Sequence, residues 1–137
     1  MKILYVHQYF KTPEEGGSIR SHYLAKGLVD AGHEVIMLTA HNSSKKKVKQ
    51  IDGISVHYLP VGYDNKFGFL KRVFAFWHYV RLARKEALKM EGLDLAYVMT
   101  TPLTTGFIAT YLKKHINLPY YFEIPSFDID NTVAWMQ

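Results

Sequence analysis

Short, mostly apolar segments of the sequence alternate with longer segments whose apolar residues recur at helical spacing. The short segments are typical of buried strands, which we expect at Ile3–Val6, Val35–Thr39, Ile54–Leu59, Leu95–Val98 and Tyr120–Glu123. The longer segments predict three helices, at about Ser18–Gly32, Gly68–Met90 and Pro102–His115. This alternation predicts an α/β fold with a Rossmann-like, doubly wound, mostly parallel open sheet, covered by helices on both faces.

One polar stretch interrupts this pattern, and one of the predicted helices needs separate description. We expect the lysine-rich stretch Ala40–Asp52 to be a surface loop. Helical periodicity over Gly68–Met90 predicts one wide apolar face, formed by Leu70, Val73, Phe74, Phe76, Trp77, Val80, Ala83, Ala87 and Leu88. The same periodicity places Lys71, Lys85, Glu86 and Lys89 opposite that face. Arg81 and Arg84 fall within the apolar sector, so either the helix breaks there or these side chains reach into a cleft.

In such a sheet, ligands bind beyond the carboxyl ends of the strands, at the point where the strand order reverses. The loop between the first strand and the first helix contains Gly16 and Gly17, which allow the backbone to approach a ligand closely. The helix N-terminus favours a phosphate, and Arg20 in its first turn adds a bidentate donor. Alternatively, the two glycines only form a turn. The loop matches neither a dinucleotide fingerprint nor a Walker P-loop.

Other candidate residues follow the later strands. The hydroxyl groups of Thr100 and Thr101 are suited to a polyhydroxylated ligand, although Thr101 also fits as an ordinary helix cap. His7 lies at the carboxyl end of the first strand. It either takes part in the chemistry of the site or has only a structural role. Glu123 ends the fifth predicted strand. Its carboxylate is suited to three roles: a base, a ligand for a hydroxyl group, or the partner of a neighbouring cation. The histidines lack metal-binding spacing, so we expect no metal.

Composition narrows the class of protein. The chain has 137 residues, of which 48% are hydrophobic and 21% are charged, as in one soluble globular domain. It has no apolar run long enough to span a membrane, no signal-peptide pattern and no cysteine, which is consistent with a cytoplasmic location. The net charge is +5, and the basic residues cluster at Lys45–Lys49 and between Lys66 and Lys89. This clustering favours an anionic partner.

The second basic cluster also contains aromatic residues. One interpretation is that it touches an anionic bilayer, at the inner face of the plasma membrane, through Lys66, Phe67, Phe69, Lys71, Arg72, Phe76 and Trp77. The alternative is a core helix with a solvated basic face. No motif supports binding of nucleic acid.

Several segments together resemble the beginning of family 4 glycosyltransferases, most of all the bacterial enzymes that build capsular or other surface polysaccharides. The segments are Met1–Phe10, Gly16–Arg20, Leu24–Leu28, Gly32–Val35, Thr101–Gly106 and Leu118–Glu123. The resemblance covers nearly the whole chain. It ends after Glu123, because Pro125 and Ser126 stand where the family usually has an arginine and an aspartate.

The resemblance implies a GT-B fold, in which two Rossmann-like domains face each other across a cleft. Residues 1–137 would be the N-terminal, acceptor-side domain of a truncated enzyme, without the donor-binding domain. Gly16 and Gly17 would approach the phosphates of a nucleotide sugar, and the sugar would pass to a glycan or lipid-linked acceptor with retention and without a metal or other cofactor. We expect this chain alone to be inactive. The alternative is a non-catalytic, membrane-recruiting subunit that works with a donor domain in trans.

Overall fold

The computed structural model describes residues 1–8, 10, 20–42, 45–62, 68–99 and 103–123. All five predicted strands are present, together with the three predicted helices, and the α/β fold is confirmed. The elements in chain order are β1 (Lys2–Val6), α1 (Arg20–Asp30), β2 (Glu34–His41), β3 (Lys47–Ile51), β4 (Ile54–Pro60), α2 (Phe69–Leu88), β5 (Leu95–Met99), the 3-10 helix η1 (Leu103–Thr105), α3 (Gly106–Ile116) and β6 (Tyr120–Glu123).

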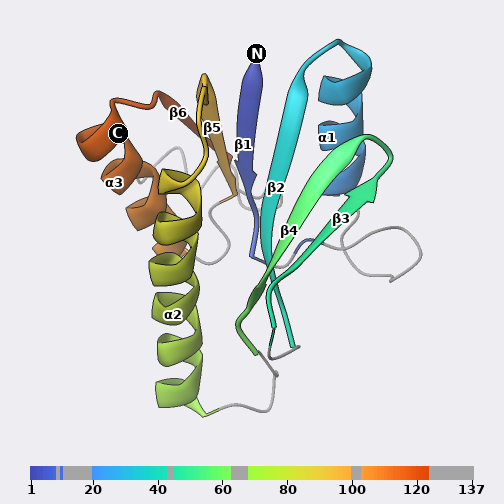
Figure 1. The fold of residues 1–137 in the computed structure, drawn as a ribbon. Helices are drawn as coiled ribbons and strands as arrows, with labels where there is room; N and C mark the ends of the chain where they lie inside the picture. The colour runs from blue at the N-terminus through green and yellow to red at the C-terminus, as the bar shows by residue number, and fades with distance from the viewer. Residues whose placement is uncertain (9, 11–19, 43–44, 63–67, 100–102, 124–137) are drawn as a thin grey trace, which may run out of the picture.

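The strands form one six-stranded sheet in the order β3-β4-β2-β1-β5-β6. All neighbouring strands are parallel except β3 and β4. In Figure 1, α1 lies on one face of the sheet, and α2 and α3 lie on the other. The chain moves outward from β1 to β2 and β4, then crosses back to β5 on the other side of β1. The strand order therefore reverses between β1 and β5, which is where such sheets bind ligands.

The predicted surface loop at Ala40–Asp52 is wrong in large part. Strand β2 continues to His41, and β3 pairs antiparallel with β4. A two-residue turn joins these strands, with φ of 50° at Asp52 and 83° at Gly53, as a tight hairpin requires. The lysines of β3 lie on an exposed edge strand, where charge prevents pairing with other molecules. They mark an edge rather than a loop.

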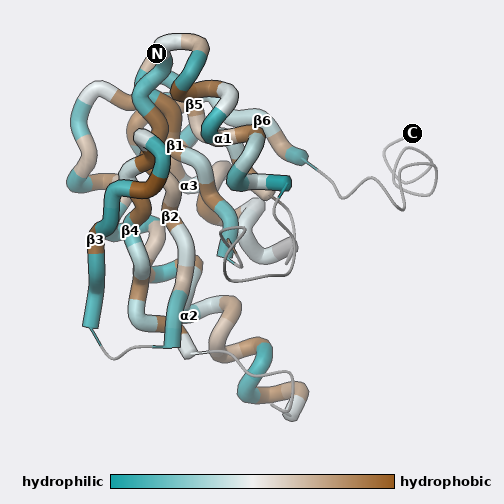
Figure 2. The backbone as a smooth tube through the Cα atoms, turned by 90° about the vertical axis from the view of Figure 1, so that its right-hand side faces the viewer, coloured by the Kyte–Doolittle hydropathy of each residue, from teal (hydrophilic) through white to brown (hydrophobic). Residues whose placement is uncertain are grey.

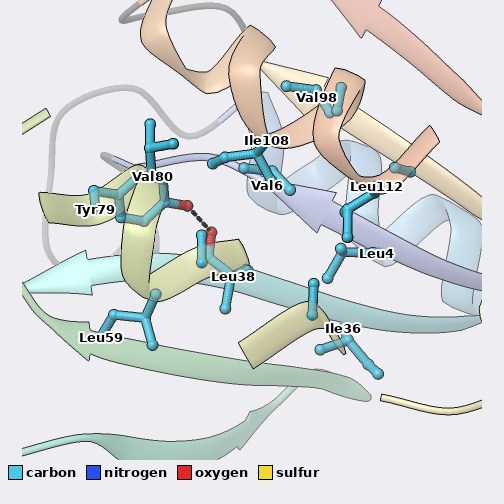
Figure 3. Packing of buried hydrophobic residues seen from close by; sticks show 14 of the residues in the cluster. Leu4, Val6, Ile36, Leu38, Leu59, Tyr79, Val80, Val98, Ile108 and Leu112 are labelled. Carbon is cyan, nitrogen blue, oxygen red and sulfur yellow. Dashed lines mark hydrogen bonds between the residues drawn. The ribbon is translucent and has the colours of Figure 1, made fainter. Parts of the chain in front are cut away.

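Two apolar layers hold the helices to the sheet. The larger layer joins strand residues such as Leu4 and Leu38 to Ile108 and Leu112 of α3 and to Tyr79 of α2, as Figure 3 shows. The hydroxyl group of Tyr79 is fully buried and donates a hydrogen bond of 2.6 Å to the backbone oxygen of Leu38, so its burial leaves no unpaired donor. The second layer packs α1 against the opposite face.

The core face of α2 matches the predicted one only in part, because Val80, Ala83 and Ala87 are buried as expected but other members of the predicted face are not. Ala75, Tyr79, Ala83 and Ala87 are buried at four-residue spacing. Four residues that the periodicity placed on the apolar face are exposed instead: Leu70, Phe74, Trp77 and Leu88. Alanines let a helix approach a sheet closely, so three alanines face the core together with Tyr79.

Glu86 was predicted on the polar face of α2 and is instead 7% exposed. It forms an ion pair with Lys46, just before β3, and lies 3.4 Å from Nδ1 of His57 on β4. Burial raises the pKa of Glu86, but the ammonium group of Lys46 and the imidazole of His57 outweigh burial and hold this pKa below its ordinary value. The carboxylate connects α2 to the β3–β4 hairpin.

Helix α2 does not break at the arginines in its apolar sector. Arg84 donates a hydrogen bond of 3.1 Å to the backbone oxygen of Phe107, and its guanidinium group lies 4.5 Å from the ring centre of Tyr111. Arg84 therefore reaches across to α3, not into a cleft. Arg81, one turn earlier, lines a groove that is described below.

Candidate functional site

The segment after β1 is fixed against β2 at the point where the strand order reverses. The backbone N–H of His7 donates to the oxygen of Leu38 at 3.1 Å. The backbone oxygen of Gln8 accepts hydrogen bonds from the N–H of Ala40 at 3.2 Å and from Oγ1 of Thr39 at 3.0 Å. The side chains of His7 and Gln8 are thereby held at the carboxyl edge of the sheet, next to the end of β5.

His7 lies where the strand pattern placed it, but it is 5% exposed. Burial lowers the pKa of His7 to about 4. Its imidazole is therefore neutral at pH 7 and acts there as a hydrogen-bond donor or acceptor, not as a cation. Among the described residues, Nδ1 of His7 has no hydrogen-bond partner.

Gln8 is a candidate that the sequence analysis did not single out. Its side chain is 1% exposed, and neither its amide nitrogen nor its amide oxygen has a partner within the described part of the chain. Buried amide groups are paired in most proteins, because an unpaired one costs about 1–3 kcal/mol. This amide therefore makes Gln8 a candidate for contact with a group outside the described residues. The sequence feature that could have identified Gln8 is its position directly after a buried strand.

Arg20 and Glu123 were predicted separately, and the structure brings them together. Arg20 begins α1 and forms an ion pair with Oε1 of Glu123, while the hydroxyl group of Tyr97 donates a hydrogen bond to Oε2. Glu123 is 6% exposed, whereas the side chain of Arg20 is 54% exposed. Three roles were considered for Glu123, and the structure shows one of them, the pairing with a cation.

Three tyrosines on neighbouring strands lie side by side across the sheet, and the middle one, Tyr97, contacts this carboxylate. The ring centres of Tyr5 and Tyr97 are 4.7 Å apart, and those of Tyr97 and Tyr121 are 5.3 Å apart. Burial raises the pKa of Tyr5 to about 12, and burial also raises the pKa of Tyr97. Both phenols stay protonated at neutral pH, so Tyr97 remains a hydrogen-bond donor to Glu123.

The other predicted residues divide into two groups. Gly16, Gly17, Thr100, Thr101, Lys66 and Phe67 lie outside the described residues, as do Ser18 and Pro102 at the predicted helix starts. Phe69, Lys71, Arg72, Phe76 and Trp77 lie on the first half of α2, apart from the carboxyl ends of β1 and β5. The candidate residues that the structure describes therefore form two groups at the carboxyl edge of the sheet, His7 and Gln8 after β1, and Arg20 with Tyr97 and Glu123.

The described residues contain neither a cluster of metal ligands nor a membrane-spanning helix. They contain no cluster of three or more histidine, aspartate, glutamate or cysteine residues that would hold a metal ion. None of their helices combines the length and the apolar character needed to cross a bilayer.

Comparison with known proteins identifies the family. Residues 15–136 match the model of the glycosyl transferase 4-like domain. Two solved structures of the C-terminal domain of a Pyrococcus furiosus hydrogenase share the fold, with TM-scores of 0.61 and 0.62. Each comparison covers 89% of this chain and 90% of the other, at 15% and 18% sequence identity. At this identity the likeness concerns the fold alone. No curated protein matches the chain.

Proposed function

The chain belongs to the glycosyl transferase 4-like domain family, and we propose that it is the acceptor-side half of a retaining glycosyltransferase. In this proposal a nucleotide sugar is the donor, and a surface glycan, free or lipid-linked, is the acceptor. A second Rossmann-like domain, in the same chain or in a separate one, binds the donor across a cleft. The reaction needs no metal.

One observation carries this proposal: the polar residues gather at the edge where the strand order reverses. Gln8 offers a buried amide with no partner among the described residues, which is suited to a sugar hydroxyl group. Arg20, which pairs with Glu123 at the carboxyl edge of the sheet, is half exposed and offers a guanidinium group to a phosphate. A sugar acceptor and a nucleotide-sugar phosphate need these two kinds of group at the same edge of the domain.

Glu123 and Tyr97 have a positioning role in this proposal. The buried carboxylate holds Arg20, and Tyr97 holds the carboxylate. When a donor phosphate draws Arg20 away, Glu123 would accept a hydrogen bond from an acceptor hydroxyl group in its place. Neutral His7 adds a second acceptor or donor at the same edge.

The proposal is tested by joining this chain to a donor-binding domain. We expect sugar transfer only from the joined protein, because catalysis needs donor and acceptor in one cleft. Turnover of a nucleotide sugar by the isolated chain would overturn the half-enzyme proposal. In the joined protein, Gly17→Val tests the approach of the donor phosphate. Lost turnover at an unchanged melting temperature supports it, and a lowered melting temperature with turnover retained would make Gly17 a turn residue only.

A peripheral contact with an anionic membrane surface is part of this proposal. Phe69 is 78% exposed and Trp77 is 44% exposed, and both lie on the first half of α2 with Lys71 and Arg72. Exposed aromatic and basic side chains on one helix are typical of helices that lie in the bilayer interface. The contact would bring a lipid-linked acceptor to the cleft.

A further inference from the structure

A groove of about 600 Å³ opens beside the first half of α2. Val61 and Gly62, which follow β4, form one wall, and Ala75 of α2 belongs to the opposite wall. Because β4 is parallel to β2 and β1, the residues after β4 lie at the carboxyl edge of the sheet. The groove therefore opens at the same end of the molecule as the candidate site, but on the other side of β2.

Cationic and polar side chains line this groove. Lys71 and Arg81 come from successive parts of α2, and His78 lies between them. None of the described lining residues is acidic. A groove that presents two cations and an imidazole is electrostatically complementary to a phosphate group.

Large apolar side chains continue from the groove over the neighbouring surface. Phe74 and Trp77 line the groove and are 73% and 44% exposed, and Leu70 beside them is 71% exposed. The ring of Trp77 lies 5.0 Å from that of Phe107 on α3, so the apolar strip extends across two helices. Figure 2 shows this end of α2 projecting away from the sheet, with hydrophobic and hydrophilic positions intermixed. An apolar strip of this kind needs a partner.

We propose that the groove binds the phosphate group of one anionic membrane lipid. Arg81 and His78, which are three residues apart on α2, contact the phosphate oxygens, Lys71 adds positive charge at the other end of the groove, and Phe74, Trp77 and Leu70 lie against the hydrocarbon chain. This inference rests on the membrane contact proposed above and deepens it, because a diffuse attraction becomes a single site with defined residues.

The combination of groove and strip favours a lipid over free phosphate. Free phosphate would use only the cations and would leave the apolar strip exposed. A lipid places its charged and apolar parts a few ångströms apart, as the groove and the strip are placed. Figure 1 shows the first half of α2 extending past the carboxyl ends of the strands, so a bound lipid would bring the candidate site toward the membrane.

The test detects binding to vesicles through the fluorescence of Trp77, which lines the groove. The chain has two tryptophans, so Trp135→Phe leaves Trp77 as the single one. We expect a blue shift of its fluorescence with phosphatidylcholine vesicles that contain phosphatidic acid, and none with phosphatidylcholine alone. Arg81→Gln should weaken binding by about five-fold, in line with one basic residue at a charged membrane surface. Arg72→Gln is the matched control, because it removes the same charge from the same helix but does not line the groove.

Each outcome has a distinct meaning. Equal losses for Arg81→Gln and Arg72→Gln would overturn the groove and retain only a diffuse membrane contact. Equal binding to neutral vesicles, or no binding to any vesicle, would overturn both. Soluble short-chain phosphatidic acid should compete, and competition by inorganic phosphate at the same concentration would assign the groove to free phosphate instead. The assay involves no turnover, so its failure leaves the sugar-transfer proposal to its own test.

Discussion

Arg20, the first residue of α1, is paired with Glu123, the last residue of β6, at the carboxyl edge of the sheet. The pair joins a helix that packs on one face to the outermost strand on the far side of β5. A nearly buried carboxylate and a half-exposed guanidinium group are an unequal pair, because water solvates the arginine alone if the two separate. The contact therefore matters more to Glu123 than to Arg20.

This inequality gives the first prediction. Arg20→Gln should lower the free energy of unfolding by about 1 kcal/mol, since solvent screens the half-exposed partner while Glu123 loses its cation. In the double variant with Glu123→Gln, the loss should be smaller than the sum of the two single losses. Urea denaturation at pH 7 measures all four proteins. Additive losses would show that the pair is not coupled in solution.

The second prediction concerns His7 and acid. Its pKa is about 4 in the folded chain, against an ordinary value of 6.5. Between these values the unfolded chain binds a proton that the folded chain excludes, so stability must fall as the pH falls through this window. His7→Gln should flatten this dependence by up to about 1.4 kcal/mol per pH unit. Urea denaturation from pH 7 to pH 4 measures it, with exposed His115→Gln as the control. Parallel curves for His7→Gln and the parent protein would contradict the burial of His7.

The third prediction concerns Glu86 and the hairpin. Its pKa is lowered in the folded chain, so the carboxylate stabilises the fold above the ordinary carboxyl range, and this contribution is lost as the pH falls through the lowered pKa. Glu86→Gln should cost about 1 kcal/mol at pH 7, a modest value because Lys46 is partly exposed. The two proteins should converge as the pH falls below this lowered pKa. A difference that stays constant with pH would mean that shape, not charge, makes Glu86 important.

The fourth prediction compares two glycines. Gly53 has φ of +83°, and a Cβ there would lie 2.8 Å from Cγ1 of Val29, so Gly53→Ala should cost about 1–3 kcal/mol. Gly27 lies inside α1 with open space around it, so Gly27→Ala should stabilise the protein by up to about 1 kcal/mol. Thermal unfolding of the two variants should give shifts of opposite sign. Stabilisation by Gly53→Ala would contradict the hairpin geometry, and destabilisation by Gly27→Ala would contradict the open space around that position.

The strands and helices were largely predictable from the sequence because burial on both sides makes the parallel strands nearly continuous apolar runs. Strand β3 was missed because it is an edge: Lys47 and Lys49 carry no apolar pattern, and only Asp52-Gly53 after them indicates a hairpin. The face of α2 was misjudged for a different reason. Hydrophobicity ranks Phe74 above Ala75, whereas close packing against the sheet selects the alanine.

The candidate site was predictable in position but not in its contacts. The rule for strand ends selected His7 and Glu123, and both lie at the carboxyl edge. The contact of Glu123 with Arg20 and Tyr97 depends on the pairing of β6 with β5, which sets Glu123 opposite Met99. The pairing register of β5 and β6 cannot be predicted from the local sequence of either strand. Gln8 was missed because its unpaired amide is a property of the packed structure.

The two outer strands of the sheet are unlike each other. On β3, Lys47 and Lys49 are exposed, and their charge discourages any other strand from adding there. On β6, the side chains near the edge are aromatic instead, and Tyr120 and Tyr121 are 36% and 58% exposed. Among the described strands, charge therefore protects one outer edge of the sheet against the addition of another strand, and the other outer edge lacks this protection.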